Sequence, residues 1–196
     1  LHVWGDALMR GEGVKQDLRQ GEELLNQAAE LGRFGSWEHL GDLWRLPVGG
    51  FRDDANAGRY YLKAAEAGEV RAMGKAAELL LQAKGREIEG RAWAKKASAK
   101  GDLLGSQLYA YCLFEGLGGG ADPGEALALL DQVATTTRAR KNQILLVAEA
   151  NRDLAERYRR GRGVPKDADA AERYEARRES LLKKRGKLFP ASKRDK

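Results

Sequence analysis

The heptapeptide GEGVKQD at residues 11–17 returns near the other end of the chain as GRGVPKD at residues 161–167. Two glycines around a charged residue, followed by Val and Asp, fit either a phosphate-binding loop or the joint of a repeated structural unit. A Walker-type phosphate loop needs Gly-Lys-Ser/Thr after a buried strand, and neither is present here. We therefore interpret the heptapeptide as the joint of a repeat.

Glycines recur at a nearly constant spacing along the sequence, which indicates a repeat that covers nearly the whole chain. Gly13, Gly49 and Gly85 are spaced 36 residues apart, as are Gly32 and Gly68. The spacing then contracts to 33 residues at Gly118 and lengthens to 45 at Gly163. The spacing gives about five units of 33 to 45 residues, with an insertion of about nine residues in the context of residues 137–150.

Each unit is predicted to be a helix, a glycine-rich joint and a second helix. In residues 36–46, Trp37, Leu40 and Trp44 fall on one face of a 3.6-residue period, and residues 57–67 are the matching second helix. Glycine permits the chain reversal at the joint, and an Asp before the second helix can cap it. The residues assigned to joints and repeat packing are Gly11, Gly13, Val14, Asp17, Gly32, Leu40, Gly41, Trp44, Gly68, Tyr158, Gly161, Gly163, Val164 and Asp167. Helix pairs of this size bury their apolar faces only against neighbours, so the sequence predicts an all-α solenoid.

GEGVKQD, GRGVPKD and the segment YYLKAAEAG resemble the Sel1-like repeat, a relative of the tetratricopeptide repeat. The resemblance implies a right-handed α/α superhelix of about five helix pairs. The expected boundaries are residues 1–32, 33–68, 69–101 (degenerate), 102–137 and 138–182, the last with the insertion, followed by a basic tail at 183–196. The second repeat departs from the family pattern at its joint, where Pro47 replaces the first glycine. A charged helix at residues 172–185 is expected to cap the end of the repeat array.

The same resemblance implies a function. Sel1-like proteins are non-catalytic adaptors, so we expect a scaffold for protein–protein interaction with no cofactor and no catalytic residues. A bacterial envelope, secretion or exopolysaccharide assembly would fit the family, as would a periplasmic or exported location.

The excess of positive charge is concentrated in the C-terminal part of the chain. Residues 138–196 hold 19 Lys/Arg and 9 Asp/Glu, whereas residues 1–137 hold 16 and 20. This asymmetry favours an acidic partner protein. It also leaves an alternative open, in which the basic end binds a polyanion such as an acidic polysaccharide, a membrane surface or a nucleic acid. Gly186 and Pro190 are expected to break the terminal helix.

Candidate partner contacts are residues on first helices outside the packing positions. They are Trp37, His39, Leu43, Tyr111, Arg157, Arg159 and Arg160. Trp37 is the leading anchor, because Trp is frequent at interface hot spots, although it could instead pack against the preceding unit.

Other chemistry finds little support in the sequence. One cysteine, Cys112, excludes an internal disulfide, and its apolar neighbours indicate a small buried side chain. His39 with Glu38 and Asp42 could be drawn as a metal cluster, but such charges are common on exposed helices. The sequence contains no run of about 18 apolar residues, so no segment is expected to span a membrane.

Overall fold

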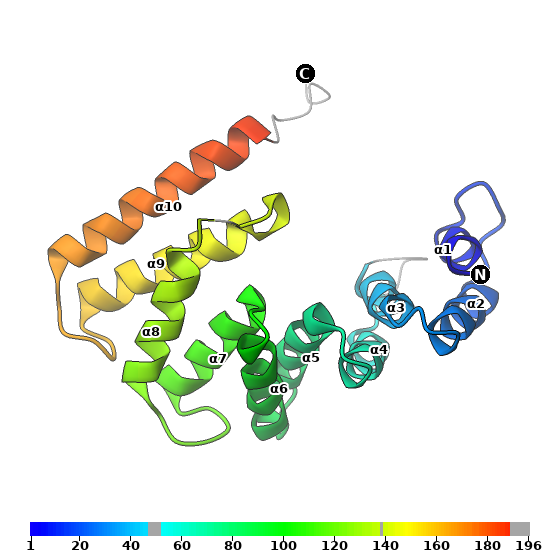
Figure 1. Cartoon of the computed structure of the whole chain (residues 1–196), viewed down its shortest axis with the longest axis horizontal. Helices are drawn as coiled ribbons and strands as arrows, with labels where there is room; N and C mark the ends of the chain where they lie inside the picture. Colours follow the sequence, from blue (N-terminus) through cyan, green and yellow to red (C-terminus); the bar gives the residue numbers. More distant parts are fainter. Residues whose placement is uncertain (47–51, 138, 189–196) are drawn as a thin grey trace. The chain divides into compact units, whose positions relative to one another are not determined.

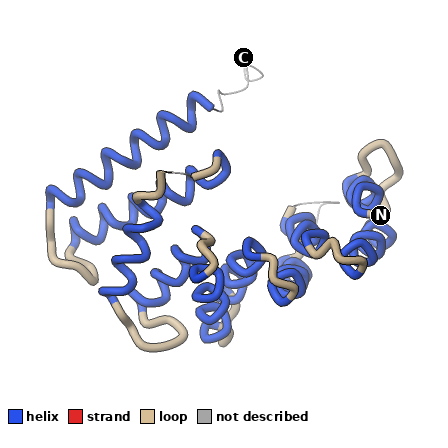
Figure 2. Tube along the Cα trace, in the orientation of Figure 1, coloured by secondary structure: helices blue, strands red, loops and turns tan. Residues whose placement is uncertain are grey.

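The computed structural model describes residues 1–46, 52–137 and 139–188 of the 196-residue chain, and the regular elements in this part are all helical (Figure 1, Figure 2). The α-helices are α1 (His2–Arg10), α2 (Leu18–Glu30), α3 (Gly35–Arg45), α4 (Asp54–Glu66), α5 (Val70–Gln82), α6 (Glu87–Ala99), α7 (Leu103–Glu115), α8 (Pro123–Ala134), α9 (Ile144–Arg160) and α10 (Ala168–Leu188). A short 3₁₀-helix, η2 (Lys141–Gln143), precedes α9. Within the described residues, no helix is both long enough and apolar enough to cross a bilayer. The predicted all-α class is confirmed.

The chain folds as two compact units, Leu1–Gly105 and Ser106–Lys196, and the division falls within α7. In unit 1 each helix from α1 to α6 packs against the next one along the chain. In unit 2, α8 packs against α9 and α9 packs against α10. Packing between successive helices is the arrangement expected of stacked helix pairs, and it confirms the predicted solenoid.

The two heptapeptides form the joints between α1 and α2 and between α9 and α10. Gly11 and Gly161 end α1 and α9 in the left-handed conformation, with φ of 70° and 72°. Gly13 and Gly163 are also left-handed, with φ of 74° and 72°. Side chains other than glycine rarely adopt this conformation, so the Gly-x-Gly pattern is explained by backbone geometry. Val164 is buried beneath its joint, whereas Val14 is half-buried.

An Asp stands at the start of each second helix that follows such a joint. Asp17 accepts a hydrogen bond from the backbone N–H of Gln20 (2.9 Å), and Asp167 accepts one from Ala170 (2.8 Å). Gly32 and Gly68 follow α2 and α4 with φ of 94° and 97°. The helix ends of the repeat are therefore set by local chemistry at both termini.

Replacing Asp17 with Ala is expected to lower the free energy of unfolding by about 1 kcal/mol, because the first-turn N–H loses its acceptor. Asp17→Asn should lose much less, since the amide oxygen can still accept. Urea unfolding of both variants measures the difference. Equal losses in the two variants would mean that charge, and not capping, explains the residue.

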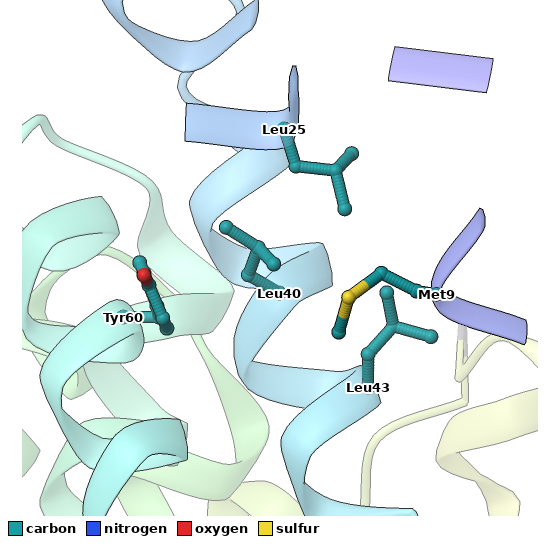
Figure 3. Packing of buried hydrophobic residues seen from close by; sticks show 5 residues of the cluster. All are labelled: Met9, Leu25, Leu40, Leu43 and Tyr60. Carbon is teal, nitrogen blue, oxygen red and sulfur yellow. The ribbon is translucent and has the colours of Figure 1, made fainter. Parts of the chain in front are cut away.

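Adjacent repeats share a core at the contact between the first two helix pairs. Figure 3 shows Met9 of α1 and Leu25 of α2 pointing toward Leu40 and Leu43 of α3, with Tyr60 of α4 on the other side. All five are buried, and Trp44 packs against this cluster while remaining half-buried. Because α3 is covered by the preceding pair as well as by α4, its apolar surface is wider than a single stripe.

Glycine in the first helix allows a large residue of the second helix to approach the backbone. A Cβ built on Gly41 would lie 2.4 Å from the ring of Tyr61, which is 1% exposed. Gly5, 36 residues earlier, makes the same close approach to Leu25, with its Cβ position 2.8 Å from the Leu25 side chain. The small residue and the large residue are thus complementary in both repeats.

The insertion lengthens the first helix of the last pair. η2 and the 17-residue α9 occupy residues 141–160, and α9 is longer than any first helix of unit 1. Asn151 is fully buried and its amide donates to the carbonyl oxygens of Ala134 and Val147, both at 2.8 Å. This side chain ties the lengthened helix to the end of α8.

The three predictions made for Gly186, Pro47 and Pro190 have different outcomes. The prediction that Gly186 breaks the terminal helix is wrong, since α10 runs through it to Leu188. A Cβ on Gly186 would meet no neighbour within 4 Å, so an exposed glycine is tolerated there at a modest cost in helix propensity. The unusual joint at Pro47 and the helix break at Pro190 lie outside the described residues.

Candidate protein-interaction surfaces

The first helices of unit 1 are joined side by side by polar pairs with a constant sequence spacing. In each pair the two residues are 33 positions apart. The pairs are Asp6–His39 (2.7 Å), Glu38–Arg71 (3.3 Å), Asp42–Lys75 (2.5 Å) and Arg45–Glu78 (2.6 Å). We call this surface of α1, α3 and α5 the first-helix face. Its polar side chains already bind one another, which reduces their availability to a partner.

Glu38 is the most buried member of the first-helix face. Its side chain is 4% exposed and receives Lys75 at 2.9 Å and Arg71 at 3.3 Å. Lys75 also binds Asp42, which in turn accepts a hydrogen bond from the hydroxyl of Tyr61 (2.7 Å). Burial, together with that hydrogen bond, raises the pKa of Tyr61.

His39 lies in a small network between α1 and α3. Its Nε2 is 2.7 Å from Asp6, and its ring centre is 5.1 Å from that of His2, which contacts the Ser36 hydroxyl. Burial raises the pKa of Asp6, but hydrogen bonds from Arg10 and His39 outweigh it and bring the pKa below its ordinary value. Burial also lowers the pKa of His2. His39 is a bridging residue between repeats that stays about a quarter exposed (26%).

The possible metal cluster does not assemble. Glu38 binds Lys75, Asp42 binds Lys75 and Tyr61, and His39 binds Asp6. In the described part of the chain, no three or more His, Cys, Asp or Glu side chains are arranged to hold a metal ion.

Trp37 occupies a packing position that keeps part of its surface accessible. It packs against the core cluster shown in Figure 3 and against a second buried cluster formed by residues of α4, α5 and α6, and its indole N–H donates to Asn26 (3.0 Å). The Nζ of Lys63 lies 5.6 Å from its ring centre, and Phe34 stacks on it at 6.0 Å. These contacts support the packing alternative for Trp37, so we do not keep it as the leading anchor.

Leu43 and Tyr111 have opposite environments. Leu43 is fully buried against the preceding helix pair, so its side chain is not accessible to a partner. Tyr111 on α7 is 48% exposed and stays available. Cys112 next to it is fully buried.

The arginines at the end of α9 are partly neutralised within unit 2. Arg157 is 5% exposed, its guanidinium stacks on Phe114 (3.6 Å), and it binds Asp153 (3.1 Å) and Glu115 (3.3 Å). Its 42-residue separation from Glu115 is the 33-residue spacing of unit 1 extended by the insertion. Arg157 therefore holds two first helices together and is unsuited to partner contact.

Arg160 and Arg159 lie on the solvent side of the same helix. Arg160 pairs with Glu156 at 2.9 Å, and both side chains are largely exposed, so the pair adds little stability. Arg159 is exposed. Tyr158, between them and Arg157, stacks on Tyr174 of α10 at 5.8 Å and so keeps a packing role.

The second half of α10 carries a cationic surface that sequence reasoning did not assign residue by residue. Residues 177–188 include six Lys/Arg and one Asp/Glu. Arg177, Lys183 and Lys184 are exposed, whereas Arg178 pairs with Glu175 (2.6 Å). The excess of positive charge at this end of the sequence was the available signal, but only the helix geometry shows which cations share a face.

A groove of about 380 Å³ runs beside this surface, entirely within unit 2. It lies between the segment after α8, the start of α9 and the second half of α10. Its lining residues are Ala134, Thr135, Thr136, Thr137, Ala139, Ile144, Val147, Arg177, Ser180, Leu181 and Lys184. We call it the α8–α10 groove.

An apolar edge on α1 was also missed. Val3 is 80% exposed and Trp4 is 54% exposed. Leu40, 36 residues after Trp4, is fully buried against the preceding helix pair. In the described chain no earlier helix pair covers the corresponding face of α1.

Successive helix pairs, glycine joints and the polar contacts between first helices define a helical-repeat protein. The Sel1 repeat family matches residues 2–32, 40–69, 87–102, 104–134 and 148–174, so the chain belongs to the Sel1-repeat family. Proteins of this family are generally scaffolds for protein–protein interaction and are typically non-catalytic. No curated protein matches the sequence significantly.

Two solved bacterial structures are similar to this chain. A Sel1 repeat protein from Oxalobacter formigenes is 23% identical, with a TM-score of 0.72 over 92% of this chain and 72% of that one. A protective antigen present in uropathogenic Escherichia coli strains, with an SLR fold, is 20% identical, with a TM-score of 0.58 over 96% of this chain and 48% of that one. At these identities the likeness shows the shared fold.

Proposed function

We propose that the chain is a non-catalytic scaffold that holds an acidic partner protein against its second unit. The observation that carries the proposal is the set of exposed cations Arg177, Lys183 and Lys184 on the second half of α10, in a protein of a scaffold family. The arginines of α9 contribute less, since Arg157 and Arg160 already bind acids of the same unit.

Two further features support a protein as the partner. Tyr111 offers a half-exposed aromatic ring in unit 2, and aromatic side chains are frequent interface anchors. The α8–α10 groove adds apolar surface beside the cations, which a purely electrostatic contact does not need. We further propose that the scaffold belongs to a bacterial assembly of the envelope, secretion or exopolysaccharide type, with a periplasmic or exported location. The bacterial source of both similar structures agrees with the first part of this proposal.

Reversing the α10 charges should release the partner. In Arg177→Glu/Lys183→Glu/Lys184→Glu, recovery of proteins crosslinked to the chain in its native source is expected to fall at least about ten-fold, because long-range attraction becomes repulsion. Crosslinking followed by mass spectrometry measures the recovery. The matched control reverses the exposed Lys15, Lys84 and Lys100 of unit 1, and it should retain the partner. Equal loss in the two variants would contradict a specific role for α10.

The polyanion alternative is favoured by one observation, the 19 Lys/Arg against 9 Asp/Glu in residues 138–196. It predicts a steep loss of binding as salt rises, since counterions are released from a linear polymer. Heparin or DNA would then bind more tightly than any protein and would displace it. Titration with both polymers at about 50 and 200 mM salt separates the alternatives.

A further inference from the structure

The α8–α10 groove combines an apolar floor with a cationic rim. We propose that it binds an extended segment of the partner protein in which an apolar residue is flanked by two acidic residues. This inference rests on the proposed function and names the part of the partner that unit 2 recognises.

The floor consists of side chains from three elements. Ile144 and Val147 of α9 and Ala134 at the end of α8 are buried beneath the groove, and Leu181 of α10 is half-buried beside them. The volume of about 380 Å³ lies within the range of about 300–1,000 Å³ typical of ligand sites. An apolar side chain of moderate size would cover this floor and exclude water from it.

The rim is formed by two cations of α10. Arg177 and Lys184 are seven residues apart, so they project from the same side of the helix at a separation of about 10 Å along its axis. Both are exposed, and the described residues that line the groove include no Asp or Glu. The ring of Tyr174 lies 5.7 Å from the Arg177 guanidinium and stacks without neutralising it. The positive charge of the rim therefore favours a ligand that carries carboxylate groups.

The geometry of an extended peptide matches both features. Side chains alternate along an extended chain, so a central residue that points to the floor has neighbours that point away from it. Acidic neighbours on each side would be about 7 Å apart, which the long side chains of Arg177 and Lys184 can span.

The opposite wall favours a peptide over other anions. The Thr135 and Thr136 hydroxyls donate to the carbonyl oxygens of Asp131 (2.7 Å) and Gln132 (2.8 Å). Because each hydroxyl already donates its proton to a carbonyl oxygen of α8, it can interact with a ligand only as a hydrogen-bond acceptor, through its lone pairs. Backbone N–H groups of a peptide supply a donor at each residue, whereas ionised phosphate and carboxylate groups only accept hydrogen bonds.

The groove arises from a local feature of this sequence. The segment between α8 and α9, together with the start of α9, belongs to the insertion in the last repeat, which the sequence of the other repeats lacks. The groove is accordingly built in part from a segment that the other described helix pairs lack.

The experiment is calorimetric titration of the full chain with three capped heptapeptides, Gly-Ser-Glu-Leu-Glu-Ser-Gly and its Gln-Leu-Gln and Glu-Ser-Glu counterparts. We expect the Glu-Leu-Glu peptide to bind at least ten-fold more tightly than either counterpart. Lys184→Glu and Arg177→Gln should each weaken its binding about ten-fold. Arg173→Glu on α10, an exposed charge reversal outside the groove lining, should change it less than two-fold. All three residues are exposed, so circular dichroism and thermal melting should match the parent chain.

Two results would overturn the inference. The first is an equal affinity for the Glu-Leu-Glu and Glu-Ser-Glu peptides, which would remove the apolar floor from recognition. The second is equal weakening by Arg173→Glu and Lys184→Glu, which would show nonspecific attraction to α10. If either occurs while the triple reversal at 177, 183 and 184 still releases the crosslinked partner, the scaffold proposal stands without the groove. If the triple reversal also has no effect, both proposals fail.

Discussion

Replacing Gly41 with Ala is expected to lower the free energy of unfolding by about 3 kcal/mol, at the upper end of the usual overpacking range. The new methyl group would lie 2.4 Å from the Tyr61 ring. That ring is 1% exposed and its hydroxyl is bound to Asp42, so it has no room to withdraw. Denaturant unfolding monitored by circular dichroism measures the loss.

Gly58→Ala is the matched control for this prediction. Gly58 lies in α4, and its added Cβ would meet only Leu79, at an ordinary contact distance of 3.6 Å. Since alanine is the better helix former, this substitution should stabilise the protein by about 0.5–1 kcal/mol. Opposite signs for the two variants would establish close helix approach at residue 41. A loss of less than 1 kcal/mol in Gly41→Ala would contradict it.

The second large effect is expected at Glu38. Glu38→Ala should cost about 2 kcal/mol, because it leaves Lys75 and Arg71 without their shared acceptor between α3 and α5. The value is below that for a fully enclosed pair, since Lys75 is 24% and Arg71 65% exposed to water.

Two comparisons check the cause of this loss. Glu23→Ala removes an exposed acid from α2 and should change stability by less than about 0.5 kcal/mol. In a double-mutant cycle, Glu38→Ala and Lys75→Met should cost less together than the sum of their separate costs. Additive losses would indicate that the two residues do not stabilise the fold through each other.

Much of the fold was predictable because it depends on local chemistry. Gly11, Gly13 and Asp17 act through their own backbone conformation or through an amide three residues away, and both leave a signature in the sequence. The 36-residue spacing then gave the helix pairs. Gly186 was misjudged because a single glycine lowers helix propensity without preventing a helix.

The candidate contacts were harder to predict because they depend on residues a full repeat away. Leu43 looked exposed on a single helix, but the preceding pair covers it. Arg157 counted as a free positive charge until Glu115, 42 positions earlier, was placed beside it. A count of charges in the sequence does not show such pairs. The groove likewise needs three elements that only the folded unit brings together.

Site-specific photocrosslinking gives the most direct test of partner binding by unit 2. A benzophenone amino acid would replace Ser180, an exposed residue in the groove lining, or Ile88, a 76% exposed residue of unit 1. We expect residue 180 to yield a protein adduct that excess Glu-Leu-Glu peptide suppresses, and residue 88 to yield no such adduct. A peptide-insensitive adduct formed equally from both positions would contradict binding at the second unit.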